Sequence, residues 1–197
     1  MGDLPPNLDL GTVVAIDSET MGLKPHRDRL CLIQLSSGDG NAHLVKFEQQ
    51  NYNAPNLVKL LENSDITKIF HYARFDVAVI NKYLQAQIDS IYCTKIASKL
   101  VRTYTDKHGL KDLCKELLLL DLSKQQQSSD WGAKDLTEEQ KIYAASDVLY
   151  LHKIKEILDQ RLLREGRDEL ADFCFKFLQT RANLDLIGFD NEDIFSH

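Results

Sequence analysis

The stretch T-V-V-A-I-D-S-E-T-M-G-L, residues 12–23, joins a continuous apolar run to two acidic side chains. The apolar run predicts a buried strand over residues 12–16 that delivers Asp17 and Glu19 to its carboxyl end. Side chains two apart on a strand point to the same face, so these two carboxylates should be neighbours.

Two acids held this close repel each other unless a cation lies between them or one takes up a proton. Carboxylate oxygen is the ligand type that Mg²⁺ and Mn²⁺ prefer, so the spacing of Asp17 and Glu19 predicts a site for a hard divalent cation. The alternative for an isolated pair of this kind is two solvated acids in a loop.

Length and composition indicate an ordinary soluble globular protein. The chain has 197 residues, of which 43% are hydrophobic and 27% charged, which fits one domain or at most two. No apolar run approaches the length of a membrane span, and the start, M-G-D-L-P-P, has no basic region followed by an apolar one. We therefore expect a cytoplasmic protein without membrane contact.

Charge and cysteine usage narrow the class further. The net charge of -6 argues against a protein that follows a long nucleic-acid backbone, although a short anionic substrate stays possible. The four cysteines are scattered singly, without metal-ligand spacing. This pattern disfavours a zinc site and a disulfide framework, and it predicts reduced, mostly buried thiols.

The order of predicted elements indicates an α/β fold. Strands over 12–16, 30–35 and 42–47 are joined by short turns, which predicts an antiparallel meander. Helices and strands then alternate, which predicts a mixed sheet flanked by helices. The alternating elements are a helix over 56–61, a strand over 68–71, a helix over 73–84, a strand over 90–92, and helices over 94–101 and 110–120.

The clearest helix start is T-E-E-Q at 137–140. It matches a capping box with Thr137 as N-cap and Gln140 at the third helical position. The apolar spacing extends this helix to about residue 164, and Gly166 should stop it. Tyr143 and Asp147 are one turn apart, so a phenol and a carboxylate should point from the same face.

The sequence also predicts how the two ends of the chain are arranged. The first ten residues should form an arm, either loose or packed on a partner. A last amphipathic helix is predicted over 168–178. The tail over 184–197 mixes acidic and apolar side chains, and we expect it to pack on this chain or on another copy.

Several ordered blocks together resemble the DEDD superfamily of 3′–5′ exonucleases, in its Tyr-containing branch, and in particular ribonuclease D. The resemblance covers about residues 13–151. The blocks are D-S-E-T-M-G-L at 17–23, L-C-L-I-Q-L at 30–35, K-I-F-H-Y-A-R-F-D at 68–76, H-G-L-K-D-L at 108–113, S-D-W at 129–131 and Y-A-A-S-D-V-L-Y-L at 143–151.

The resemblance implies a ribonuclease H-like fold and a metal-dependent 3′–5′ exoribonuclease. The family's four metal-binding acids correspond here to Asp17, Glu19, Asp76 and Asp147. They would hold two divalent ions, Mg²⁺ or Mn²⁺, in a two-metal hydrolytic site. Tyr143 would orient the attacking water or help remove its proton, although a Tyr on a helix face with a satisfied hydroxyl is the simpler interpretation of that residue alone.

Substrate-binding candidates lie in the same blocks. Leu23 would wedge against the terminal base, the alternative being a core leucine. Ser18 and Thr20 of the same motif are further candidates. His71 is either a neighbour of the metal site or a buried, hydrogen-bonded histidine.

The chain has too few residues after the last block for the helical domains that follow in ribonuclease D, so we expect a single exonuclease domain over 1–197. Its core would cover about 11–165, and 168–197 would serve packing or oligomer contacts. Among relatives it resembles the nano-RNase C family, which degrades RNA dinucleotides and forms homo-oligomeric rings. That resemblance implies very short RNA substrates and a homo-oligomer, as an octameric ring.

A preference for dinucleotides needs a group that binds the 5′ phosphate, for which basic side chains are suited. Lys107, His108 and Lys111 are the candidates by charge and position, with Arg27 and Arg29 behind them. Two other functions stay open. One is trimming of the 3′ ends of longer structured RNA, as in ribonuclease D, and the other is an inactive ribonuclease H-like binding module.

Overall fold

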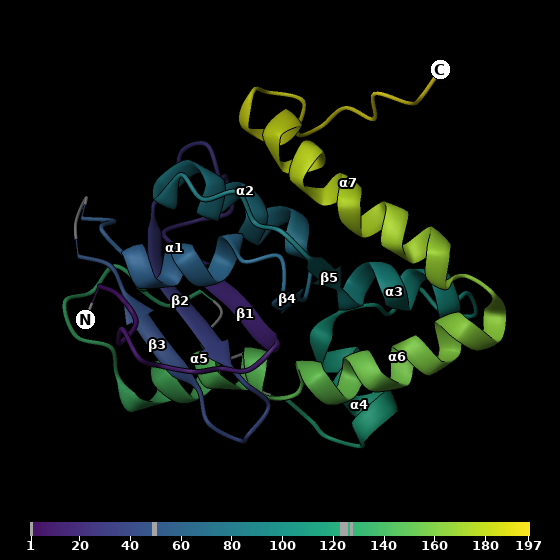
Figure 1. Ribbon diagram of the computed structural model, residues 1–197, viewed down its shortest axis with the longest axis horizontal. Helices are drawn as coiled ribbons and strands as arrows, with labels where there is room; N and C mark the ends of the chain where they lie inside the picture. Colours follow the sequence, from purple (N-terminus) through teal and green to yellow (C-terminus); the bar gives the residue numbers. More distant parts are fainter. Residues whose placement is uncertain (1, 49–50, 123–125, 127) are drawn as a thin grey trace.

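The computed structural model describes residues 2–48, 51–122, 126 and 128–197. Within these residues the chain forms a five-stranded sheet in the order β3-β2-β1-β4-β5 (Figure 1). Strands β1, β2 and β3 pair antiparallel, and β4 and β5 continue the sheet in parallel with β1. The predicted meander followed by parallel strands is confirmed. The strands are β1 Val13–Thr20, β2 Leu30–Ser36, β3 His43–Lys46, β4 Thr67–Phe70 and β5 Ile91–Cys93.

Strand β1 is longer than its apolar run. The sequence predicts an end near residue 16, but β1 continues to Thr20 because β2 pairs with it as far as the contact of Thr20 with Leu30. Strand β4 pairs with β1 only over Val13–Ala15. Asp17 and Glu19 therefore lie inside a strand that is paired on one side beyond Ala15, which holds their backbone rigid.

The helices surround this sheet (Figure 1). Helix α5 packs on β1 and β2, α6 packs on α3, and α7 packs on α2 and β5. The apolar residues of the strands and of the inner helix faces form the main core. The helices are α1 Pro55–Glu62, α2 Ala73–Leu84, α3 Thr94–Val101, α4 Leu110–Leu118, α5 Glu138–Leu149, α6 Leu151–Glu165 and α7 Asp168–Leu186.

The helix predicted from Thr137 to about residue 164 is two helices. The capping box is present as predicted, and Gly166, at φ +62°, ends the second helix. The chain bends at Tyr150, whose φ of −105° and ψ of −6° depart from helical values. The continuous prediction is wrong because the apolar residues before and after Tyr150 face different neighbours, the sheet for α5 and α3 for α6.

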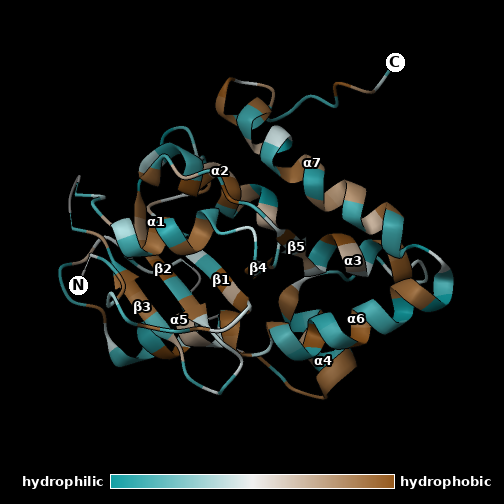
Figure 2. Cartoon of the chain, in the orientation of Figure 1, coloured by the Kyte–Doolittle hydropathy of each residue, from teal (hydrophilic) through white to brown (hydrophobic). Residues whose placement is uncertain are grey.

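Helix α7 extends eight residues beyond the predicted end at 178. Buried Asp185 stabilises its last turns by accepting hydrogen bonds from Arg181 one turn earlier, at 2.6 Å, and from Arg74 of α2, also at 2.6 Å. Figure 2 shows polar and apolar residues alternating along this helix, as expected of one apolar face on the core. The tail packs partly on its own chain, where the rings of Phe177 and Phe195 lie 5.7 Å apart.

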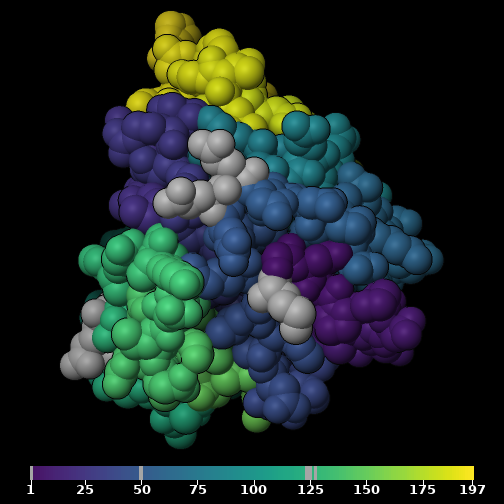
Figure 3. Space-filling view, turned by 90° about the vertical axis from the view of Figure 1, so that its left-hand side faces the viewer, coloured from purple at the N-terminus to yellow at the C-terminus, as the bar shows by residue number. Residues whose placement is uncertain are grey.

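The N-terminal arm packs on its own chain. The carboxylate of Asp3 accepts hydrogen bonds from the backbone N–H groups of Asn56 and Leu57, at 3.0 and 2.9 Å, and so satisfies the first turn of α1. Leu4 and Leu10 are buried in the core. In Figure 3 the purple N-terminal residues lie on the surface against the blue segment that follows β3.

All four cysteines are unbridged, and three of them are buried, as predicted. In the described part of the chain, no helix has both the length and the apolar character needed to cross a bilayer.

Candidate active site

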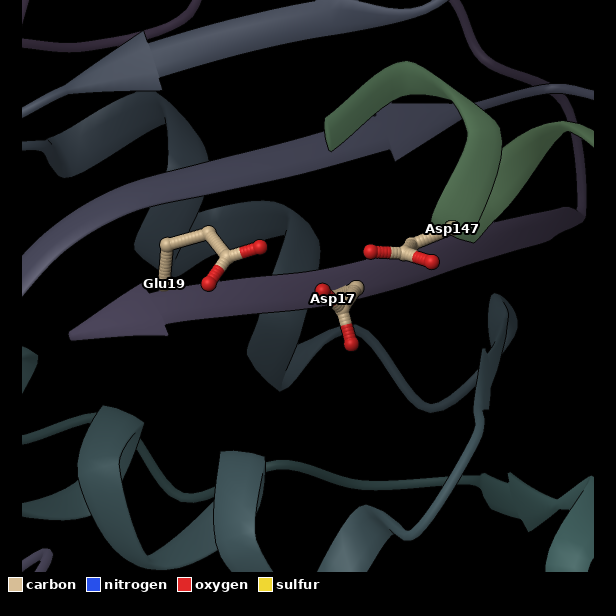
Figure 4. A group of neighbouring side chains, drawn as sticks. All are labelled: Asp17, Glu19 and Asp147. Atoms are coloured by element: carbon tan, nitrogen blue, oxygen red, sulfur yellow. The ribbon is translucent and has the colours of Figure 1, made fainter. Parts of the chain in front are cut away.

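Three carboxylates converge where α5 crosses β1. Asp17 and Glu19 project from β1 and Asp147 projects from α5, and Figure 4 shows the three side chains directed toward a common space. One oxygen from each lies within 4.8 Å of the others. The predicted cluster of acids therefore forms from two segments 130 residues apart in the sequence.

The local sequence sets the position of Asp147. The Thr137 hydroxyl accepts a hydrogen bond from the Gln140 backbone N–H at 3.2 Å, and the Gln140 side chain accepts one from the Thr137 N–H at 2.9 Å. This capping box defines where α5 begins, and Ala144 and Val148 are buried on its inner face. Tyr143 and Asp147, one turn apart, both line the cavity that contains Asp17 and Glu19.

The fourth predicted acid, Asp76, lies beside the group formed by the other three carboxylates. It lies in the first turn of α2, is buried, and accepts a 2.6 Å hydrogen bond from the Ser18 hydroxyl. Its charge contributes to the raised pKa values of Asp17 and Glu19, so it is their electrostatic neighbour. Ser18, a predicted substrate contact, holds Asp76 in this position.

The acids repel one another in a buried setting. Burial, and then the charges of Asp76, Asp147 and Glu19, raise the pKa of Asp17 well above its usual value. Burial and the neighbouring Asp147 raise the pKa of Glu19 to about 9, and burial raises those of Asp76 and Asp147 to about 7. At neutral pH the group needs protons or cations, and its all-carboxylate donors fit hard divalent cations such as Mg²⁺ or Mn²⁺.

This electrostatic strain predicts a stability that depends on pH and on metal. An acid whose pKa is near 4 when unfolded and 7 to 9 when folded binds more protons in the folded state, so the metal-free protein should lose stability as pH rises through that window. Bound Mn²⁺ would relieve the repulsion. Thermal unfolding with and without Mn²⁺ should therefore give a larger increase in Tm at pH 8 than at pH 5.5, and an equal increase at both pH values would contradict this account.

Gln34 is a site residue that sequence analysis missed. It faces Asp17 across the β1–β2 pair, is fully buried, and donates a 2.6 Å hydrogen bond from Nε2 to the Asp17 carboxylate. This contact favours the charged form of Asp17 and fixes its orientation. A polar residue inside the apolar run L-C-L-I-Q-L was the available signal.

The acids open into a cavity of about 600 Å³. Leu23 lines it with 87% of its surface exposed, so a core role for that leucine is excluded. Thr20 also lines the cavity, but its hydroxyl donates to the Gly22 carbonyl and so stabilises the turn that carries Leu23. Ser18 lies in the lining as well, and further lining residues include Met21, His71, Tyr72, Phe75, Lys95, Leu110, Lys111, Trp131 and Tyr143.

The turn after β1 has no space for a side chain at Gly22. A Cβ at that position would clash with the Asp28 carboxylate, which accepts a 3.0 Å hydrogen bond from the Lys24 backbone N–H. Arg27 forms an exposed ion pair with Asp28, and Arg29 donates to the Gly132 carbonyl at 3.3 Å. Both arginines thus stabilise the turn that presents Leu23.

His71 is a neutral, hydrogen-bonded residue that also lines the cavity. Burial and the charge of Lys95 lower its pKa to about 3. The Thr94 hydroxyl lies 2.9 Å from His71 Nδ1 and donates its single proton to the Phe70 carbonyl at 3.1 Å. This arrangement suits the tautomer in which His71 Nδ1 carries the proton and Nε2 is an acceptor. His71 is thus a hydrogen-bonded histidine on the wall of this cavity, and its place beside a metal site stays a prediction.

The three basic residues predicted to bind the 5′ phosphate lie in different places relative to the cavity. Lys111 lines the cavity and forms a 3.1 Å ion pair with Asp121. Lys107 and His108 are not among the cavity-lining residues of the described chain, and His108 Nδ1 lies 2.8 Å from the Ser98 hydroxyl. Lys95, which sequence analysis did not single out, lines the cavity.

Comparison with known proteins connects this geometry to a family. Residues 5–163 match the family described as 3′-5′ exonuclease. Ribonuclease D of Gluconacetobacter diazotrophicus is 32% identical over 155 residues, which cover 78% of this chain and 39% of that protein. The chain therefore spans about two fifths of the length of this relative.

Solved structures add a match over the whole chain. Brucella melitensis NrnC bound to pGG is 56% identical, with a TM-score of 0.96, and the match covers 100% of this chain and 96% of that one. Brucella melitensis NrnC with bound Mg²⁺ gives 56% identity and a TM-score of 0.94 over the same shares. The predicted ribonuclease H-like fold, with its mixed sheet flanked by helices, is confirmed.

Proposed function

Because this chain belongs to the 3′-5′ exonuclease family, with ribonuclease D and NrnC among its relatives, we propose that it is a metal-dependent 3′–5′ exoribonuclease. The observation that carries the proposal is the group formed by Asp17, Glu19 and Asp147, whose oxygens lie within 4.8 Å in a cavity open to substrate. An inactive binding module is disfavoured, since none of the four predicted acids is missing from the sequence.

The four carboxylates would bind metal in different ways, according to where each one lies. Asp17, Glu19 and Asp147 would hold divalent cations directly. Asp76, held in place by the Ser18 hydroxyl, would be the fourth acid of the metal site. Two Mg²⁺ or Mn²⁺ ions, when bound, would supply an activated water and charge stabilisation for the leaving 3′ oxygen. The structure of Brucella melitensis NrnC with bound Mg²⁺ supports the use of a divalent cation.

Tyr143 is suited to orient water and not to act as a strong base. Burial, and then the charges of Asp147, Glu19 and Asp17, raise its pKa above the usual value for tyrosine, so its hydroxyl keeps its proton at neutral pH. A protonated phenol can donate one hydrogen bond and accept another. We propose that Tyr143 holds the attacking water in line with the scissile phosphate.

For the substrate, we propose very short RNA, particularly 5′-phosphorylated dinucleotides, with nucleoside monophosphates as products. The relative bound to pGG, at 56% identity over the whole chain, supports this choice. The cavity of about 600 Å³ also suits a ligand of a few nucleotide units more than a duplex. Lys95 and Lys111 supply positive charge in the lining. A homo-oligomeric, octameric ring stays a prediction from the resemblance.

The second candidate is trimming of longer RNA 3′ ends. Sequence identity to ribonuclease D over most of the chain favours it. The two candidates share chemistry and differ in the length of RNA that is cleaved fastest.

The proposed polarity can be tested with one RNA labelled at either end. With Mg²⁺, a 3′-labelled heptanucleotide should release its label as a mononucleotide at the first cleavage, whereas a 5′-labelled one should shorten stepwise. Addition of EDTA should stop both reactions. Release of a labelled mononucleotide from the 5′ end first would contradict the assignment.

Leu23→Ala should separate activity from stability. Because Leu23 is 87% exposed, its truncation should change Tm by less than about 2 °C, whereas loss of an apolar contact with the terminal base should raise KM by roughly 10-fold. Leu163→Ala on α6, at 65% exposure and outside the cavity, is the matched control and should change neither. Unchanged KM in Leu23→Ala would exclude the wedge role.

A further inference from the structure

Trp131 has no assigned role in the active site, although it lies beside the acids. It is the only tryptophan in the sequence and is 2% exposed, yet it contributes to the cavity lining beside the acids. It packs in a small apolar cluster with Cys31, Leu32 and Ala144, separate from the main core. A large buried ring at a cavity wall constrains whatever side chain it contacts.

The indole contacts Tyr143. The two ring centroids lie 6.0 Å apart at an interplanar angle of 41°, which is within the range of favourable aromatic pairs. Tyr143 also lines the cavity and projects from α5 one turn before Asp147. The ring of Trp131 therefore limits the directions in which the Tyr143 hydroxyl can point.

The segment that carries Trp131 is bound to the start of the same helix. The Gln140 side chain donates to the Ser129 hydroxyl and to the Asp130 carbonyl, both at 3.1 Å, while its oxygen completes the capping box of α5. On the other side, Lys46 of β3 donates to the Ala133 carbonyl at 2.6 Å. Trp131 and Tyr143 are thus held in one frame by Gln140.

The contact is one of ring packing. The indole N–H of Trp131 is buried and has no hydrogen-bond acceptor among the residues described. Because tryptophan offers only that donor, replacement by phenylalanine would remove ring area without removing a hydrogen bond. This separates packing from hydrogen bonding in an experiment.

We propose that Trp131 is a positioning residue for the reaction, because its ring holds the Tyr143 phenol in the orientation that places the attacking water. The inference rests on the proposed exonuclease function. It predicts that loss of the indole lowers kcat, leaves KM unchanged, and matters only while Tyr143 has its hydroxyl.

A double-mutant cycle on dinucleotide hydrolysis with Mn²⁺ tests this coupling. Trp131→Ala should lower kcat by about 10-fold when Tyr143 is present and by less than about 2-fold in Tyr143→Phe. Trp131→Phe should lie between Trp131→Ala and wild type, and it provides a variant with a conserved aromatic core if the alanine variant is unstable. Leu44→Ala removes apolar packing from the same cluster outside the cavity lining and should show no coupling.

Fluorescence gives a readout independent of activity. Since Trp131 is the sole tryptophan, an unchanged, blue-shifted emission maximum in Tyr143→Phe would verify that the indole stays buried in the background used for the cycle. Equal fold-losses of kcat in both backgrounds, or a rise in KM with kcat unchanged, would overturn the positioning role while leaving the proposed function intact. Absence of hydrolysis by the wild-type protein would overturn both.

Discussion

Asp17→Asn should abolish RNA hydrolysis and stabilise the metal-free protein. Asp17 has the other three acids as electrostatic neighbours and would be one of the residues that hold the divalent cations, so its loss should lower kcat by roughly 10³-fold or more. The same change replaces a buried acid, whose ionised form is disfavoured by burial and by its acidic neighbours, with a neutral amide. At pH 8, above the pKa of about 7 of Asp76 and Asp147, Tm should rise by about 2–4 °C for each kcal/mol of repulsion that is relieved.

Activity should fall while the Tm of the metal-free protein rises, and these two effects distinguish loss of the site from misfolding. A variant that merely misfolds would lose activity together with Tm. Thermal unfolding at pH 5 provides the internal control, since the remaining acids are then protonated and the gain in Tm should shrink. Asp17→Asn with near wild-type turnover, or with a lower Tm at pH 8 in the presence of EDTA, would contradict the structure of the site.

Tyr143→Phe should cut turnover by about 10²-fold while leaving the fold intact. The change removes one hydroxyl from a half-buried ring whose packing against Trp131 is retained. KM should be nearly unchanged, since the proposed role is to orient water in the transition state and not to bind RNA. The measurement is kcat and KM on a 5′-phosphorylated dinucleotide, with Tm as the stability control.

Tyr150→Phe is the matched control for that hydroxyl. Tyr150 follows α5 in the sequence and packs on the main core, outside the cavity lining. Its phenylalanine variant should keep wild-type kcat. Equal losses in the two variants, or wild-type rates in Tyr143→Phe, would remove Tyr143 from the mechanism.

Local periodicity was sufficient to predict much of the site. The spacing of Asp17 and Glu19 on a strand, and of Tyr143 and Asp147 on a helix, defines which side chains share a face, and the structure places all four on one cavity. The resemblance added Asp76, which no local pattern indicates. Its position depends on how α2 approaches β1, and Ser18 makes that contact.

Features that depend on long-range register were missed. Gln34 matters because the antiparallel pairing of β2 with β1 places it opposite Asp17, and a shift of one residue would turn it to the other face. Trp131 and Lys95 likewise reach the cavity through packing between distant segments. The bend at Tyr150 has the same origin, since tertiary contacts on two different neighbours override a continuous helical pattern.

We propose that the protein uses the acids of β1 and α5, together with divalent metal, to hydrolyse very short RNA from its 3′ end. The most direct test is a time course with Mg²⁺ or Mn²⁺ on end-labelled RNAs of two to about twenty nucleotides, with Asp17→Asn as the blank. We expect rapid metal-dependent conversion of the dinucleotide to monophosphates and much slower cleavage of longer chains. Equal rates at every length would favour ribonuclease D-like trimming, and no metal-dependent hydrolysis at any length would contradict the account.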